Sequence, residues 1–291
     1  VTGPEISALC GIDRFLAGIH DPTAATLHPG KLVRGLRRVA LAKGVRIFEN
    51  SRMLKLERQS PAIVRTAKGT MRSPVCILTL NAWSTSVPEL RPSILVIASD
   101  DSVTGPVPEL LEKMGYLRRP LMGDSQTFVT GFRTTADHRF QPGITGGIIG
   151  FGGLGTNRFE GRSIREADIR SCVSRGFPAF ADLPFADSWC GPIDRTRSGL
   201  PLFGPLPGSP NIFYGFGFSG NGVATTPVTA KILASLALDK KDEWSSCGLV
   251  RPPERWLPPE PIRYIGAHMV RHAIRRKDRL EQENRVPGPL V

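Results

Sequence analysis

The pattern of apolar residues predicts four helices. Apolar residues such as Leu32, Leu36 and Val39 recur at helical spacing after Pro29, which suits a first helical turn. Gly44 is a suitable C-terminal stop for this helix. The other predicted helices cover residues 163–175, 223–238 and 262–283, and the last is basic and amphipathic.

Shorter apolar runs predict strands. Val45–Phe48 alternates in the manner of a strand, so residues 29–48 form one helix-turn-strand arm of an α/β layer. Val75–Leu80 is apolar on both faces, as expected of a buried central strand. The remaining predicted strands cover residues 53–56, 62–66, 94–98, 127–133 and 144–149.

These elements predict an α/β (α+β) fold. An incomplete Rossmann-like layer is interleaved with an antiparallel β-sheet domain, because residues 84–188 consist mainly of short β-like runs between proline and glycine turns. We expect the chain to divide into segments 1–27, 28–83, 84–188, 189–240 and 241–291, the last being a polar, proline-rich arm followed by the basic helix.

Composition narrows the class of protein. The chain has 291 residues and a net charge of +12, which suits an anionic partner, but its aromatics amount to only 7% and do not alternate with the basic residues. We therefore favour a solvated basic surface over specific nucleic-acid binding. A basic binding module for nucleic acid or anionic lipid, using residues 251–285, stays open as an alternative.

Five widely spaced cysteines and the isolated pair His268 and His272 predict neither a disulfide framework nor a metal site, so a cytoplasmic location is the expectation. No apolar run reaches the length of a membrane span. The first residue is Val1 and not methionine, which suggests an incomplete reading frame or a processed piece.

Two segments match the glycine pattern G-x-G-x-x-G. Gly150–Gly155 is followed by polar, irregular sequence, so we interpret it as a glycine-rich strand or bulge. Asn211–Gly222 is different, because a strand leads into a glycine turn and then into the helix that begins at Val223. The N–H groups at such a helix start favour an anionic ligand, and glycines let a flat ligand approach the backbone.

The segments Trp189–Gly204 and Pro210–Gly222 resemble the C-terminal signature of the D-amino-acid-oxidase superfamily of FAD-dependent oxidoreductases. Its members include glycine oxidase, sarcosine oxidase and γ-glutamylputrescine oxidase. His28–Ile47 and Asn81–Ser84 also fit the family, in the same order along nearly the whole chain.

The resemblance implies FAD as the cofactor. It assigns 28–83 and 189–240 to an FAD-binding domain and 1–27 and 84–188 to a substrate domain. The helix after the glycine turn would lie against the pyrimidine edge of the flavin and stabilise negative charge on its reduced form. The implied cofactor-binding residues are Met53, Asn81, Ala82, Trp83, Gly191, Pro192, Gly217, Phe218, Ser219, Gly220, Asn221, Gly222 and Val223.

The sequence also departs from the family. The family's opening strand, G-x-G-x-x-G turn, helix and acidic residue do not precede His28, so we expect the unit that holds the diphosphate to be missing. Ile193 and Ala224 stand where relatives carry an arginine or a lysine that binds the substrate carboxylate. Gly191 stands where sarcosine oxidase has the cysteine that bonds flavin, so covalent attachment is not expected.

The substrate is therefore expected to be an amine, or an amino acid held by Arg133, Arg195 or Arg197. His28 and Asp194 are further candidates by position, although a structural hydrogen-bonding role suits each of them better.

The leading hypothesis is oxidation of a C–N bond with hydride transfer to flavin, with oxygen or another electron acceptor and with the oligomeric state open. The alternative within the family is a truncated, non-catalytic chain that does not bind FAD alone.

Overall fold

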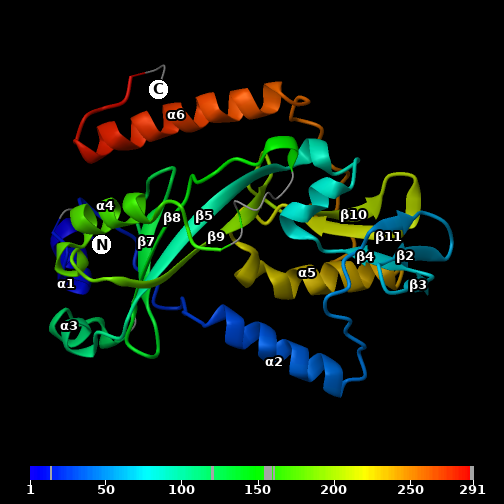
Figure 1. Ribbon diagram of the computed structural model, residues 1–291, viewed down its shortest axis with the longest axis horizontal. Coiled ribbons are helices and arrows are strands. Elements are labelled where there is room, and N and C mark those ends of the chain that lie inside the picture. Colours follow the sequence, from blue (N-terminus) through cyan, green and yellow to red (C-terminus); the bar gives the residue numbers. More distant parts are fainter. Residues whose placement is uncertain (14, 119–120, 154–158, 160, 289–291) are drawn as a thin grey trace.

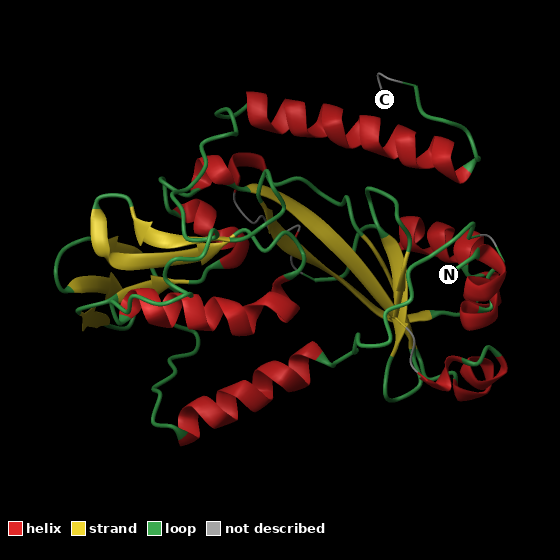
Figure 2. Ribbon diagram, turned by 180° about the vertical axis from the view of Figure 1, so that it is seen from behind, coloured by secondary structure: helices red, strands yellow, loops and turns green. Residues whose placement is uncertain are grey.

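The computed structural model describes residues 1–13, 15–118, 121–153, 159 and 161–288 (Figure 1). The expected mixed α/β fold is confirmed: one five-stranded sheet and two three-stranded sheets are combined with helices. The five-stranded sheet occupies the middle of the molecule, and both three-stranded sheets lie at one end of it (Figures 1 and 2).

The five-stranded sheet is antiparallel throughout, with the order β6-β7-β8-β5-β9. Its two longest strands, β5 and β9, pair along nearly their whole length. In β5 the side chains alternate between fully buried and half-buried, so one face of the sheet packs into the core and the other is more open. The strands are β5 (Leu95–Thr104), β6 (Leu121–Gly123), β7 (Thr130–Thr134), β8 (Phe140–Ile144) and β9 (Phe185–Arg195).

The second sheet has the order β10-β11-β4, with β11 parallel to β4 and antiparallel to β10. Helix α5 (Gly222–Ala237) packs on it through Ile232 and Leu233, which are buried against Phe203. The third sheet, β1-β2-β3, is a small antiparallel unit. The strands are β1 (Lys55–Glu57), β2 (Ala62–Arg65), β3 (Thr70–Ser73), β4 (Cys76–Leu78), β10 (Leu202–Leu206) and β11 (Ser209–Phe216).

An aromatic core closes the opposite end of the five-stranded sheet. Phe140 of β8 stacks on Phe180 with ring centroids 4.1 Å apart, and Phe132 and Tyr116 join them. Such ring pairs add to the stabilisation that burial of their area provides. The helices packed around this core are α1 (Gly3–Cys10), α3 (Pro108–Lys113) and α4 (Glu166–Gly176).

Two strand predictions near the second sheet have different outcomes: Val75–Leu80 forms the predicted strand, as β4 over Cys76–Leu78, whereas the strand predicted at Val45–Phe48 is wrong. Val45–Phe48 forms no strand, since no partner strand pairs with it in the part of the chain that is described. Val75–Leu80 was expected to be a central strand, but β4 has a partner on one side only among the described strands, and Ile77 is 42% exposed. Both segments have the composition of buried parallel strands. Among the described residues, Val45–Phe48 has no neighbouring strand and β4 has one instead of two.

Helix α2 (Pro29–Ala42) forms as predicted and contains no buried residue. It stands away from the body of the molecule in both views (Figures 1 and 2). Its apolar side chains are accordingly open, with Val33 63%, Leu36 59% and Val39 52% exposed.

Other boundaries also differ from the prediction. The strand expected at 144–149 does not form: β8 ends at Ile144, Gly146 has φ +70° and turns the chain, and Ile149 makes only an isolated bridge to Ile97. The expected strand or bulge at Gly150–Gly155 begins instead with a 3-10 turn over Phe151–Gly153, and Leu154 and Gly155 lie outside the described residues. The pattern missed β3, whose exposed polar residues give no apolar signal.

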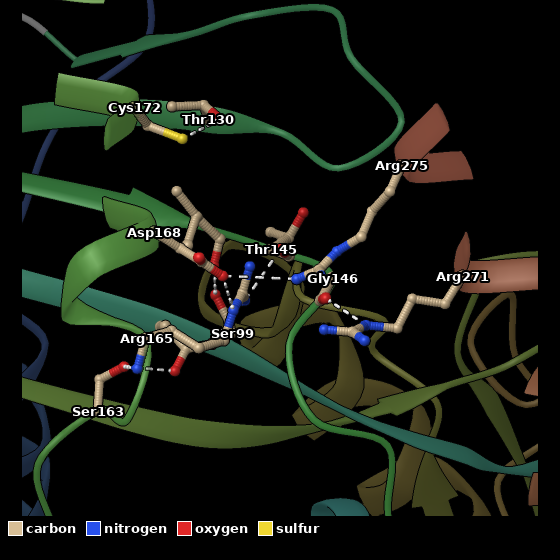
Figure 3. A network of polar contacts seen from close by, with 12 residues as sticks. Ser99, Thr130, Thr145, Gly146, Ser163, Arg165, Asp168, Cys172, Arg271 and Arg275 are labelled. Carbon is tan, nitrogen blue, oxygen red and sulfur yellow. Dashed lines mark hydrogen bonds and ion pairs between the residues drawn. The ribbon is translucent and has the colours of Figure 1, made fainter. Parts of the chain in front are cut away.

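Helix α6 (Ile262–Gln282) lies along the molecule (Figure 1) and is fixed to it by polar contacts, of which those of Arg271 and Arg275 are drawn in Figure 3. The carboxylate of Asp278, only 6% exposed, accepts hydrogen bonds from the N–H groups of Thr127 at 3.2 Å and Phe128 at 3.1 Å. Arg271 Nε donates to the Gly146 carbonyl at 2.8 Å, and Arg275 lies 3.5 Å from Asp168. The basic helix therefore packs on its own chain.

We predict that Asp278→Ala releases the C-terminal half of α6. The substitution leaves two backbone N–H groups without their acceptor, at a cost of about 1–3 kcal/mol. Faster hydrogen exchange at the amides of Thr127 and Phe128 and faster proteolysis after residue 282 are the expected results. Glu283→Ala, an exposed change just beyond the helix, is the control, and equal exchange in both variants would contradict this role of Asp278.

Candidate functional site

The turn between β11 and α5 requires glycine at two positions. Gly217 has φ +85°, and a Cβ atom there would lie 2.3 Å from Cγ2 of Thr196. Gly220 has φ +101°, a conformation that residues with a side chain rarely adopt. The glycines predicted to serve a ligand thus also serve the shape of the turn.

Asp194 holds this turn from the end of β9. Its carboxyl group is fully buried, and Oδ2 accepts a 2.6 Å hydrogen bond from the N–H of Gly217. Burial raises the pKa of this carboxyl group, and the backbone N–H groups of the turn act in the opposite direction. The neighbouring N–H of Thr196 donates to Ser219 Oγ at 3.2 Å. The end of the sheet and the start of α5 are therefore joined at two points.

The N-terminus of α5 is open to a ligand. Asn221 precedes the helix, and its side chain makes no capping hydrogen bond. The first N–H groups of a helix have no partner within it and carry partial positive charge. Gly220, Asn221 and Val223 are all exposed, so these donors lie at the surface.

Two other predicted segments meet this turn. Asn81, the first residue of the 3-10 helix η1 (Asn81–Ser86), donates from Nδ2 to the Pro192 carbonyl at 3.3 Å. Ile193 Cδ1 would lie 3.7 Å from a Cβ atom on Gly220, while a Cβ atom on Gly191 would meet nothing within 4 Å. Segments 81–83, 191–193 and 217–223 therefore form one surface, to which Trp83, 50% exposed, belongs.

The more open face of the five-stranded sheet continues this surface. Antiparallel partners place their side chains on the same face, and Ile97 pairs with Ile193, Ser99 with Gly191 and Asp101 with Trp189. Since Ile193 borders the glycine turn, the whole row lies on the side of the sheet that leads to α5.

Polar groups lie farther along the same face. Gln141 Nε2 donates to Asp101 Oδ1 at 3.3 Å, and Arg133 Nε donates to Gln141 Oε1 at 3.0 Å. Sequence reasoning missed Asp101, Gln141 and Trp189. Only the alternation along β5, combined with the pairing of β5 and β9, could have identified them.

The residues predicted to bind substrate do not form one cluster. Arg133 Nη1 donates to the Leu27 carbonyl at 2.7 Å, which places it close to His28. His28 itself caps α2, accepting from the N–H of Lys31 at 3.4 Å. Arg195 is exposed at the end of β9, and Asp194 faces the turn and not the open sheet face. Met53 directly precedes β1, and its contact with a cofactor stays a prediction.

Within the described ranges, no three His, Cys, Asp or Glu side chains gather as a metal ion would require. The same ranges contain no helix with the length and apolar character needed to cross a membrane.

A protein-family model matches most of this chain. The model of the DAO family, described as FAD dependent oxidoreductase, matches residues 1–236. The chain belongs to this family. Its resemblance to the family's C-terminal signature is thereby confirmed.

Curated relatives agree with this assignment. The "Probable oxidoreductase OrdL" of Haemophilus influenzae is 27% identical over 81% of this chain and 52% of the relative, and the "Gamma-glutamylputrescine oxidoreductase" of Escherichia coli is 26% identical over 77% and 50%. The DAO-family chain thus spans about half the length of the curated relatives it matches.

Among solved structures, glycine oxidase from Geobacillus kaustophilus superposes with a TM-score of 0.71 at 17% identity, covering 89% of this chain and 67% of that one. L-proline dehydrogenase from P. horikoshii gives 0.70 at 18% identity, covering 86% and 69%. At these identities the likeness concerns the fold.

The surface fits the flat ring system of a flavin in two respects. It offers open space at Gly191 and an exposed glycine at Gly220, and it offers unpaired helix N–H donors at one edge. The second feature suits the end of the ring that gains negative charge on reduction.

We predict that Asp194→Ala destabilises the chain and loosens the turn. The substitution leaves the buried N–H of Gly217 without an acceptor, at a cost of about 1–3 kcal/mol. Denaturant unfolding should show this loss, while Asp194→Asn, which keeps an oxygen acceptor, should lose less. Asp182→Ala, at an exposed aspartate, is the control. Equal stability of Asp194→Ala and the control would refute the assigned role.

Proposed function

We propose that this chain takes part in the FAD-dependent oxidation of a C–N bond in an amine or amino acid. The observation that carries the proposal is the uncapped start of α5, placed by Asp194 beside the open face of the five-stranded sheet. When bound, FAD would supply the hydride acceptor for oxidation of the substrate carbon next to nitrogen.

Groups of the chain itself would position the flavin ring and stabilise its negative charge. The N–H groups at the start of α5 would border the pyrimidine edge of the ring, where positive potential favours negative charge. Asn81, Trp83 and Gly191 would border the flat ring, with Asn81 fixed to Pro192. We assign residues 28–83 and 189–240 to cofactor binding, and the sheet of 84–188 to the substrate.

An amine substrate is favoured over a simple amino acid. Ile193 and Ala224 are apolar, so these two positions bordering the turn offer no cation for a carboxylate. The name of the Escherichia coli relative, which refers to a substituted diamine, supports the same class. Oxygen or another oxidant would be the final electron acceptor.

The second candidate is a chain with the family's fold that does not bind FAD alone. The exposed apolar side chains of α2 and the unpaired segment Val45–Phe48 favour it, because the surface that would border a parallel sheet has no partner among the described residues. A basic anion-binding module has less support, because Arg271 and Arg275 of α6 contact this chain's own Gly146 and Asp168.

We predict that the purified chain, mixed with FAD and desalted, retains the visible absorption of oxidised flavin and loses it on addition of an amine under anaerobic conditions. Loss of flavin on desalting would reject the first candidate for this chain alone and favour the second. Retention without bleaching by any amine would leave a flavin-binding chain and reject the oxidation.

The same assay tests the role of α5. Ala224→Asp places a carboxylate at the third residue of the helix, where it stabilises the helix dipole but repels an anionic ligand. We expect FAD affinity to fall about two- to fivefold without loss of stability, and the midpoint potential of the flavin to decrease. Ala230→Asp, an exposed site farther along the helix, is the control, and equal effects of both changes would rule out this contact.

A further inference from the structure

The open sheet face carries an aspartate and a tryptophan side by side. Asp101 of β5 and Trp189 of β9 are direct partners in the antiparallel register. Side chains of such partners lie on the same face with Cβ atoms about 5 Å apart. Asp101 is half-buried and Trp189 is 38% exposed, so both are accessible from that face.

The carboxylate of Asp101 is held in place without a direct counter-ion. Gln141 donates to Oδ1, and Arg133 orients Gln141 while its Nη1 binds Leu27. No ion pair to Asp101 is found in the described part of the chain, although Arg133 is close enough to lower the pKa of this carboxyl group. Burial acts in the opposite direction and is the larger effect, so the pKa is raised.

Neighbouring residues determine where the carboxylate of Asp101 lies. The adjacent Asp100 points to the other face, where Arg165 at 2.9 Å and Ser163 at 2.7 Å engage it. On the open face the next strand carries Gly143, and a Cβ atom there would lie 2.6 Å from Asp101 Oδ1. The glycine therefore leaves the space that this carboxylate occupies.

A half-buried carboxylate beside an aromatic ring is the chemistry that recognises an ammonium group. The carboxylate accepts charge-assisted hydrogen bonds, and the ring face attracts the cation. Along the strands, Asp101 is two residues beyond the Ser99–Gly191 pair and four beyond the Ile97–Ile193 pair, about 7 and 14 Å at the usual rise. The second ammonium group of an extended diamine can lie this far from the amine that reacts.

We propose that Asp101 and Trp189 form a subsite for a second, non-reacting ammonium group of a diamine substrate. The proposal rests on the proposed function for the position of the reacting amine, which lies nearer to Gly191 and Ile193. Gln141 and Arg133 are positioning residues, because they orient the carboxylate of Asp101, and that carboxylate contacts the ligand.

The binding experiment needs no turnover. Isothermal titration calorimetry with 1,6-diaminohexane and with hexan-1-ol is carried out on the wild-type chain, on Asp101→Asn and on the exposed control Asp182→Asn. We expect the diamine affinity to fall at least about tenfold in Asp101→Asn and to stay unchanged in the control, since one charge-assisted contact is lost. Hexan-1-ol should bind weakly to all three proteins.

Two further variants guard against misfolding. Asp101→Glu keeps the charge and should retain most of the diamine affinity. Trp189→Leu should lose part of that affinity while its melting temperature equals that of the wild type. Equal diamine affinity of wild type and Asp101→Asn would overturn the subsite. A uniform loss in Asp101→Asn and Asp101→Glu, with an unchanged melting temperature, would overturn recognition by charge.

Kinetics of the FAD-loaded chain separate this subsite from the proposed function. Asp101→Asn should raise the KM for 1,6-diaminohexane toward that for hexylamine and leave kcat little changed. Absence of bound flavin or of any amine oxidation would reject the proposed function, while the calorimetry would still decide the subsite. Normal oxidation with the same KM in wild type and Asp101→Asn would reject the subsite alone.

Discussion

The hydrogen bond from the N–H of Gly217 to the carboxylate of Asp194 connects the end of the five-stranded sheet to the turn before α5. Asp194 lies at the end of β9, and Gly217 begins the turn into α5. Because the carboxyl group is fully buried, its position is fixed by the surrounding core. The open start of α5 consequently has a defined place relative to the five-stranded sheet, and the surface proposed here for cofactor and substrate depends on it.

The pairing of β5 with β9 determines what that surface presents. A continuous antiparallel register puts Ile97, Ser99 and Asp101 opposite Ile193, Gly191 and Trp189. The alternate residues of β5, such as Val96 and Ala98, are buried in the core, so a shift by one residue would expose them. The core packing of one face therefore fixes the chemistry of the other, including the carboxylate of Asp101.

The region around α2 stands in contrast to this ordered surface. Its apolar side chains, the segment Val45–Phe48 and the free side of β4 all have the character of an α/β layer, yet they find no partner among the described residues. These segments lie within residues 1–236, which match the DAO family model, and the chain spans about half the length of the curated relatives it matches. This unpartnered surface is the observation on which the second proposed function rests.

Several features could be predicted from the sequence alone, because they depend on residues that are close together in the chain. Glycines and helical periodicity identified the turn before Val223 and the helix that follows, and the family signature over 189–222 gave the fold. Only the tertiary structure decided the rest. Val45–Phe48 fails as a strand because a strand needs a neighbour, and Asp101 meets Trp189 because β5 and β9, far apart in sequence, pair in one register. The sequence of one strand does not show with which distant strand it will form hydrogen bonds, so local patterns could not predict the pairing of β5 with β9.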